Sequence, residues 1–138
     1  LVHGDFSLTN VIIDNASDQV ASILDWELST LGDPMADFSY HCLQYKLNPI
    51  LSDTAQCKKL GIPTEKEYLK LYADKVDYYI DSEWDLYMSF NLFKLAGISQ
   101  GIMGRVRDGT AAGVNAEETG MRARLLAESA WDLVKDRT

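Results

Sequence analysis

The stretch of sequence that decides the fold is HGDFSLTN at residues 3–10, followed by LDWE at residues 24–27. Between these two segments, residues 11–13 are β-branched and residues 15–18 have the composition of a turn. Residues 19–24 form a second apolar run. This pattern predicts a β-hairpin that separates the two polar segments along the chain.

Three side chains in these segments have the chemistry of a transfer site that uses a metal ion. Asn10 precedes the first strand and Asp25 follows the second, so an antiparallel hairpin brings them to the same rim, on strands about 4.8 Å apart. An amide oxygen and a carboxylate at that separation can share a hard cation such as Mg²⁺. Asp5, on the same loop as Asn10, can then face a reacting hydroxyl group.

The spacing of these residues matches a known catalytic pattern. It is H-x-D-x-x-x-x-N with an Asp fifteen residues after the Asn. Protein kinases use H-R-D-x-x-x-x-N, in which the Asp accepts the proton of the substrate hydroxyl and the Asn binds a metal ion. Taken singly, His3 is a structural histidine, Asn10 a turn residue and Asp25 a strand-end cap. Their combination favours the catalytic interpretation.

The charge distribution permits two interpretations. The formal net charge is −8, and residues 1–40 hold seven acidic residues and no Lys or Arg. Such a block is either a solvated surface or a site that receives metal ions or basic groups from another segment. Nucleic-acid binding is disfavoured because a basic stripe is absent. A binuclear metallohydrolase normally needs more imidazoles than His3 and His41 provide.

The composition indicates one compact, soluble domain over residues 1–138. Hydrophobic residues make up 46% of the sequence and charged residues 25%. No apolar run approaches the ~20 residues of a membrane span, and no secretion signal is visible. Cys42 and Cys57 fit a reducing compartment, so a cytoplasmic location is expected. The sequence lacks an initiator Met, and we expect it to be a piece of a longer protein.

From Pro34 onward the periodicity is helical, except for a loop around Gly61 and Pro63. A long helix with apolar residues around most of its girth is expected to be central and buried, and its glycines form a narrow face for close packing. The predicted helices cover residues 34–47, a segment from the Thr64–Glu67 capping box to about Tyr79, residues 84–107 with Gly97, Gly101 and Gly104, and residues 117–135.

At this point HGDFSLTN, and LDWELSTLGDPMADFSY at residues 24–40, resemble the phosphotransferase enzyme family, which includes aminoglycoside phosphotransferases and choline kinase-like enzymes. The resemblance is closest to the kinase-like domain fused to acyl-CoA dehydrogenases in some larger proteins, in which FKLAGISQGI at residues 93–102 also has a counterpart. It implies an α+β fold, the mainly helical C-terminal lobe of a protein-kinase-like fold, with a β-hairpin carrying the catalytic loop and metal site.

The resemblance also implies a role for individual residues. Asp5 resembles the catalytic base, and Asn10 and Asp25 resemble the metal ligands, with Glu27 a weaker candidate for a second acid near the metal. Asp37 resembles a buried acid that braces the catalytic loop, and His3 is expected to support the loop structurally. The implied cofactors are ATP and Mg²⁺, and the implied substrate is a small molecule with a hydroxyl group.

One part of the expected machinery has no counterpart in this sequence. A phosphotransferase of this kind needs an amino-terminal lobe with a Gly-rich loop and a Lys that reaches the phosphates. No G-x-G-x-x-G occurs here. We therefore expect residues 1–138 to be the C-terminal lobe of an ATP-dependent small-molecule kinase, inactive without the missing lobe and part of a protein that can include an acyl-CoA dehydrogenase domain. The alternative is a non-catalytic kinase-like binding module.

Overall fold

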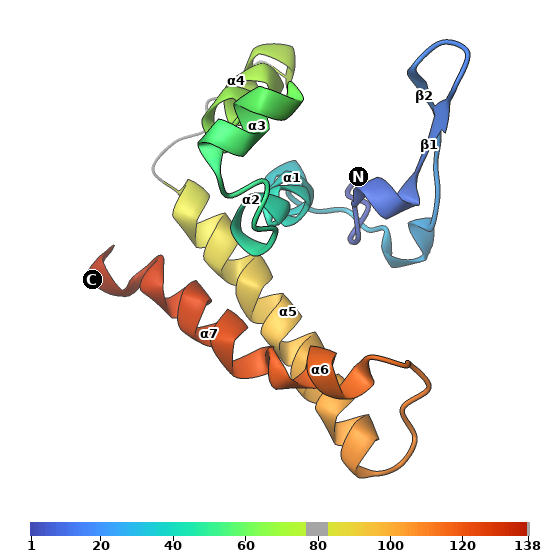
Figure 1. Ribbon diagram of the computed structural model, residues 1–138, viewed down its shortest axis with the longest axis vertical. Helices are drawn as coiled ribbons and strands as arrows, with labels where there is room; N and C mark the ends of the chain where they lie inside the picture. The colour runs from blue at the N-terminus through green and yellow to red at the C-terminus, as the bar shows by residue number, and fades with distance from the viewer. Residues whose placement is uncertain (77–82, 138) are drawn as a thin grey trace. The chain divides into compact units, whose positions relative to one another are not determined.

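The computed structural model describes residues 1–76 and 83–137. The chain divides into two compact units, Leu1–Ser82 and Glu83–Thr138. The structure is mainly helical with one two-stranded antiparallel sheet, and Figure 1 labels its elements along the chain. The predicted class, a mainly helical α+β fold with a hairpin near its start, is confirmed.

The predicted hairpin lies in the first unit. Strands β1 (Val11–Asp14) and β2 (Gln19–Ile23) are antiparallel, and Val11 faces Ile23 at the open end. The turn between them is held by Asp14, whose carboxylate accepts hydrogen bonds from the Ala16 N–H at 3.0 Å and the Ser17 hydroxyl at 2.6 Å. Short 3₁₀ helices flank the strands on each side, η1 (Leu8–Asn10) and η2 (Trp26–Leu28).

The helix predicted over residues 34–47 is two helices, α1 (Pro34–Cys42) and α2 (Gln44–Leu47). It begins where expected, because the Asp33 side chain accepts a hydrogen bond from the Met35 N–H at 2.9 Å and so caps α1. The break falls at Leu43, whose N–H donates to the Tyr40 carbonyl only three residues back. This tighter local hydrogen bond interrupts the α-helical pattern.

Two further helices complete the described part of the first unit, α3 (Thr54–Leu60) and α4 (Glu65–Val76). The sequence predicted only a loop where α3 lies, although Asp53 caps that helix by accepting from two backbone N–H groups. The capping box at α4 is present, since the Glu67 carboxylate accepts from the Thr64 N–H at 2.8 Å. Tyr79, the expected end of this helix, lies outside the described residues.

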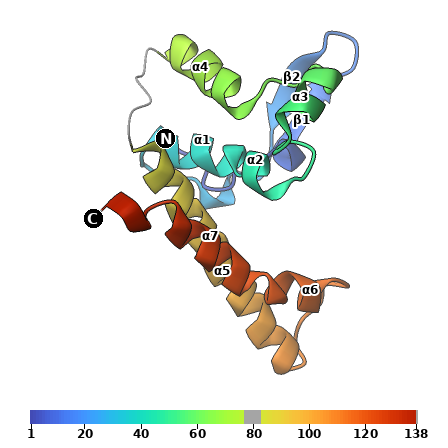
Figure 2. The ribbon, with the colours of Figure 1, turned by 60° about the vertical axis from the view of Figure 1, so that its left-hand side comes forward.

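The second unit is built on helix α5 (Trp84–Arg107), beside which α7 (Ala123–Asp132) runs back in the opposite direction (Figure 2). Helix α6 (Ala116–Met121) packs on the far end of α5, and η3 (Lys135–Arg137) follows α7. A Cβ on Gly120 would lie 2.9 Å from the Met103 Cβ, so a glycine permits the close approach of α6 to α5. The single helix predicted over residues 117–135 is instead interrupted at Arg122.

Helix α5 also departs from its predicted environment. One face of the helix is buried. Its side chains are at most 6% exposed, and they are Met88, Asn91, Leu92, Ala96 and Ser99. The side chains of Phe90 and Phe93 are 60% and 67% exposed, so the helix is not buried around its girth. Among residues 1–76 and 83–137, nothing lies within 4 Å of a Cβ built on Gly97 or Gly104, so the described residues do not show the expected close packing at those two positions. No helix within residues 1–76 and 83–137 has both the length and the apolar character of a membrane span.

Candidate active site

The loop at residues 3–10 is held at its start by a short antiparallel bridge. The Val2 N–H donates to the Thr30 carbonyl at 2.8 Å, and the Thr30 N–H donates back to the Val2 carbonyl at 3.1 Å. Gly4 then has a φ of +86°, and a Cβ built there would lie 2.5 Å from the Leu28 carbonyl oxygen. A glycine is required here both for the backbone conformation and for the close approach of residue 28.

Asp37 ties helix α1 to the start of this loop. One oxygen of its carboxylate accepts a hydrogen bond from the His3 backbone N–H, and the other accepts from the Gly4 N–H at 2.8 Å. These contacts join residues that are more than thirty positions apart in the sequence. They are the backbone contacts that the family resemblance implies for Asp37.

His3 lies under the loop and is 3% exposed. Its Nε2 is 2.7 Å from the Leu24 carbonyl oxygen, and its Nδ1 accepts a hydrogen bond from the Asp5 N–H at 3.3 Å. Because a carbonyl oxygen can only accept, Nε2 carries the proton in this arrangement. The Trp26 ring packs against the imidazole with a centroid separation of 4.7 Å. Both ring nitrogens of His3 are thus used in contacts inside the protein.

Asp5 is half-buried, and its carboxylate lies near enough to Tyr40 on helix α1 to affect the pKa of that phenol. Burial, as the largest cause, together with the nearby Asp5 carboxylate raises the pKa of the Tyr40 phenol to about 12. Tyr40 was not among the residues predicted from the sequence. The available signal was its place on the helix, three residues after Asp37.

Asn10 links the loop to the hairpin. Its Nδ2 donates to the Asp5 backbone carbonyl at 3.0 Å, and its own backbone carbonyl accepts from the Leu24 N–H at 2.8 Å. The first contact uses the amide nitrogen, so the amide oxygen stays available as an acceptor. The second contact places Asn10 beside the residue that precedes Asp25. The backbone of Asn10 therefore lies beside that of the Leu24–Asp25 segment, as the predicted hairpin requires.

Asp25 and Glu27 lie at the other side of this rim, in and just before η2. Asp25 has a φ of +63°, in the left-handed region that Asp and Asn tolerate better than most residues, and its side chain is exposed. Glu27 is exposed within the 3₁₀ helix. Within the described residues, no group of three or more His, Cys, Asp and Glu side chains is arranged to hold a metal ion.

The donor set at the rim nevertheless fits Mg²⁺. This ion is commonly bound by one or two protein oxygen ligands and completes its octahedral shell with water and substrate phosphates. Asn10 offers an amide oxygen and Asp25 an exposed carboxylate, both hard donors of the kind Mg²⁺ prefers. These two side chains are fewer than the ligands that a closed metal site requires.

Aromatic side chains of helices α1 and α4 pack near the loop at residues 3–10. The ring centroids of Phe6 and His41 are 5.2 Å apart. The Nε2 atom of His41 is 3.1 Å from the hydroxyl of Tyr68 on α4. Burial lowers the pKa of His41, because the charged imidazolium is disfavoured away from water. Phe38 of α1 and Tyr72 of α4 stack on each other with a ring-centroid separation of 3.7 Å. These contacts fix α1 and the loop to the helical part of the first unit.

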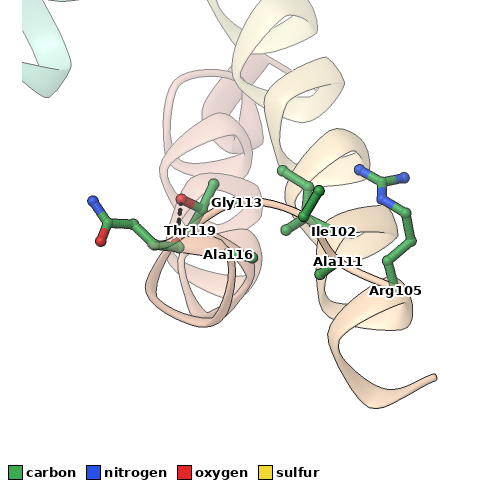
Figure 3. A pocket seen from close by; sticks show the side chains of 8 residues that line it. Ile102, Arg105, Ala111, Gly113, Ala116 and Thr119 are labelled. Atoms are coloured by element: carbon green, nitrogen blue, oxygen red, sulfur yellow. Dashed lines mark hydrogen bonds between the residues drawn. The ribbon is translucent and has the colours of Figure 1, made fainter. Parts of the chain in front are cut away.

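Two pockets bear on where small molecules could bind. One of about 230 Å³ lies in the first unit under the loop, and His3, Phe6, Trp26 and Tyr72 are among its lining residues. A second pocket, of about 400 Å³, lies in the second unit between the end of α5 and α6 (Figure 3). Its wall includes Arg105 but none of the residues predicted from the sequence, so it does not belong to the loop and rim described above.

Comparison with known proteins supplies the family. The model of the phosphotransferase enzyme family matches residues 1–70. A crystal structure named "putative aminoglycoside phosphotransferase", from Ralstonia eutropha JMP134, is 43% identical with a TM-score of 0.89, and the match covers 98% of this chain and 42% of that one. This structural similarity confirms the predicted fold, the mainly helical C-terminal lobe of a kinase-like phosphotransferase.

Curated relatives include acyl-CoA dehydrogenase family members. Family member 10 of Mus musculus is 43% identical over 137 residues, which cover 96% of this chain and 13% of the relative. Family member 11 of Mus musculus is 33% identical over 141 residues, covering 98% of this chain and 18% of the relative. The chain thus spans less than a fifth of the length of these two relatives. Together, the family match and the structural similarity show that this chain belongs to the phosphotransferase enzyme family.

Proposed function

We propose that this chain is the C-terminal lobe of an ATP-dependent kinase that transfers the γ-phosphoryl group to a hydroxyl group of a small molecule. The observation that carries the proposal is the hydrogen-bonded connection of Asp5, Asn10 and the Leu24–Asp25 segment. Asn10 donates to the Asp5 carbonyl and accepts from the Leu24 N–H, which supports a site at this end of the hairpin built from Asp5, Asn10 and Asp25. The family match to residues 1–70 supports the reaction class.

In this proposal Asp5 orients the acceptor hydroxyl and takes its proton. The acceptor oxygen forms a bond to the γ-phosphorus, the bond from that phosphorus to the β,γ-bridging oxygen breaks, and ADP leaves. Such a reaction depends mainly on positioning and on charge, not on covalent chemistry by the protein. The hydrogen bonds from Asp37 and the packing of His3 hold the backbone that carries Asp5.

Asn10 and Asp25 would hold Mg²⁺, and Glu27 is a weaker third candidate. When bound, the ion would neutralise charge on the nucleotide phosphates. The amide oxygen of Asn10 would be the metal ligand, because its amide nitrogen donates to the Asp5 carbonyl. The same contact couples the metal-binding residue to the backbone of the base.

We further propose that residues 1–138 act as one domain with an N-terminal lobe that lies elsewhere in the complete protein. The partial coverage of the related proteins supports this arrangement. The missing lobe would supply the Gly-rich loop and the phosphate-binding Lys. A fused acyl-CoA dehydrogenase domain and a cytoplasmic location belong to the same proposal. The alternative, a non-catalytic binding module, predicts nucleotide binding without turnover.

The test is phosphoryl transfer by the full-length protein with MgATP, measured as ADP formation with an aminoglycoside, choline or water as the acceptor. Asp5→Asn is expected to lower turnover by about 10²–10⁴-fold while nucleotide affinity changes little, because it removes a positioned general base. Asp18→Asn, the same substitution at an exposed hairpin turn, is the matched control. Wild-type turnover in Asp5→Asn contradicts the role of Asp5, and nucleotide binding without any ADP formation favours the non-catalytic alternative.

A further inference from the structure

Helix α5 carries an apolar stripe on the side away from its buried face. The members of this stripe recur every three or four residues, so they lie on one line along the helix. They are Leu86, Phe90, Phe93, Gly97, Gly101 and Gly104. Leu86, Phe90 and Phe93 are 53%, 60% and 67% exposed. A contiguous exposed apolar patch marks an interaction surface, whereas single exposed apolar residues are ordinary.

The α5 stripe has a bulky half and a flat half. Its three large side chains all lie toward the start of the helix, and its three glycines all follow them. Within the part of the chain that the structure describes, no atom lies within 4 Å of a Cβ built on Gly97 or Gly104. A Cβ built on Gly101 would lie 3.9 Å from Nη1 of Arg105. The flat half is therefore open to a close approach, with a cation at its edge.

The two halves fit each other when a second copy of the helix runs antiparallel to the first. With Gly97 of one copy opposite Gly97 of the other, Phe93 lies opposite Gly101 of the second copy. Phe90 lies opposite Gly104 in the same way, because the two members of each pair are equally far from Gly97 along the chain. Each copy offers the same surface, as a two-fold contact requires. A parallel pair in register would instead set ring against ring.

The charges at the ends of α5 favour the same orientation. Asp85 lies in the first turn of the helix, and Arg105 and Arg107 lie in its last turn. An antiparallel pair places the acidic end of each copy beside the basic end of the other, whereas a parallel pair brings like charges together. The guanidinium of Arg105, beside Gly101, would also reach the ring of Phe93 of the second copy, which is a favourable cation–π arrangement.

We propose that the α5 stripe is a contact between two copies of this chain, which pair through antiparallel α5 helices about a two-fold axis at Gly97. Phe90 and Phe93 anchor the contact, and the glycines of the second copy receive their rings. Burial of these aromatic surfaces drives the association. The contact is independent of the proposed phosphoryl transfer and of Asp5.

Cysteine cross-linking in the full-length protein tests the position of the axis. Cys42 and Cys57 are both 0% exposed, so they do not compete for reagent. Gly97→Cys places a thiol at the axis, where it meets the same thiol of the second copy, and a short bismaleimide should link most of the protein into dimers. Ile98→Cys is the matched control, because Ile98 is 47% exposed on the same helix but lies about 100° around it from Gly97. It should form few dimers.

A mixture of two variants tests the orientation. Phe90→Cys and Gly104→Cys should cross-link with each other and not when either is alone, because antiparallel pairing sets these two positions opposite each other. The mixed dimer keeps Phe93 on both copies and Phe90 on one of them. In a parallel pair each variant would link to itself, and that result overturns the proposal.

The aromatic anchors are tested in the Gly97→Cys background. Adding Phe93→Gln should lower the rate of cross-linking by at least about tenfold, as expected for an aromatic anchor at the centre of an interface. Adding Trp131→Gln, at a ring that is 62% exposed on α7, should leave the rate unchanged. Thermal melts confirm that each variant is folded.

Three results overturn the second-copy proposal. If Gly97→Cys reacts with a soluble maleimide but forms no dimers, the stripe stays open in solution. If its thiol is protected and forms no dimers, another segment of the complete protein covers the stripe. If Gly97→Cys and Ile98→Cys cross-link equally fast, the links arise from random collisions.

Discussion

The Gly4 backbone N–H donates a 2.8 Å hydrogen bond to the Asp37 carboxylate, across a sequence separation of 33 residues. The other oxygen of that carboxylate accepts from the N–H of His3. The conformation of the loop is therefore set by a side chain from helix α1 as well as by the loop's own sequence. Substitutions at either end of this contact should disturb stability and activity together.

Replacing Asp37 tests this coupling. Asp37→Ala leaves two backbone N–H groups of a partly buried loop without their acceptor, which is expected to cost on the order of 1–3 kcal/mol of unfolding free energy. Turnover should fall as well, because the loop that carries Asp5 loses its support. Thermal melts and ADP formation are measured on the same full-length preparations.

A matched control for Asp37→Ala is Asp53→Ala. Asp53 also accepts from two backbone N–H groups, but at the start of α3 and away from the loop. Losing this cap should cost about 1 kcal/mol with turnover unchanged. An Asp37→Ala protein that is as stable as the wild type and catalytically dead would assign Asp37 to the chemistry itself.

A second prediction concerns Gly4. Gly4→Ala places a Cβ 2.5 Å from the Leu28 carbonyl oxygen in addition to forcing a positive φ on alanine. Gly61 shares the positive φ, at +70°, but no atom of the part of the chain that the structure describes lies within 4 Å of a built Cβ. Gly61→Ala should therefore show only the backbone penalty, about 1–2 kcal/mol. Gly4→Ala should lose more stability and also turnover. Equal melting points for the two variants would show that the approach of residue 28 relaxes freely.

The metal ligands give a third prediction. Asp25→Asn removes a full charge and retains a side chain that tolerates the φ of +63°, whereas Asn10→Ala removes only an amide dipole. The Mg²⁺ concentration for half-maximal turnover should rise by at least about tenfold in Asp25→Asn and by less in Asn10→Ala. Glu27→Gln, at the weaker candidate, should have the smallest effect. An unchanged Mg²⁺ requirement in both of the first two variants rules out the rim as the metal site.

A fourth prediction follows from the buried imidazole of His41, whose pKa is lowered from its ordinary 6.5 by burial. As pH falls below 6.5, the unfolded chain binds a proton at this position before the folded protein does, so acid favours unfolding. His41→Phe has no such proton uptake. The thermal midpoint of the wild type should therefore fall more steeply than that of His41→Phe between pH 7.5 and 5, with a constant difference above pH 7.5. Parallel curves over the whole range would contradict the burial effect.

The sequence predicted those elements whose signals are local. The hairpin follows from β-branched residues around a turn, and its limits agree with β1 and β2. The start of α1 follows from Asp33 and Pro34, and that of α4 from the Thr64–Glu67 box, because a capping side chain bonds to backbone only two or three residues away. Phosphotransferase membership also follows from a local motif and is confirmed by the family match to residues 1–70.

Other features depend on which distant segments meet. The sequence alone could not show that Phe90 and Phe93 are exposed, since apolar periodicity gives a helix's composition and not the number of neighbours that cover it. It also missed α3, and it could not predict the break at Leu43, because the choice between i−3 and i−4 hydrogen bonding there is made by small differences in local geometry.

At the candidate site, the sequence by itself determined the residue types and their order: an acid at position 5, an amide at 10 and an acid at 25 on either side of a hairpin. The family resemblance implied that Asp37 braces the loop, whereas the tertiary structure alone decided which loop atoms Asp37 contacts and that Tyr40 of helix α1 lies near Asp5, since residues more than thirty positions apart are brought together only by packing of the folded chain. Hydrogen bonds within a turn or cap depend on backbone geometry over a few residues. The contacts between Asp37 and the loop depend on where a whole helix lies.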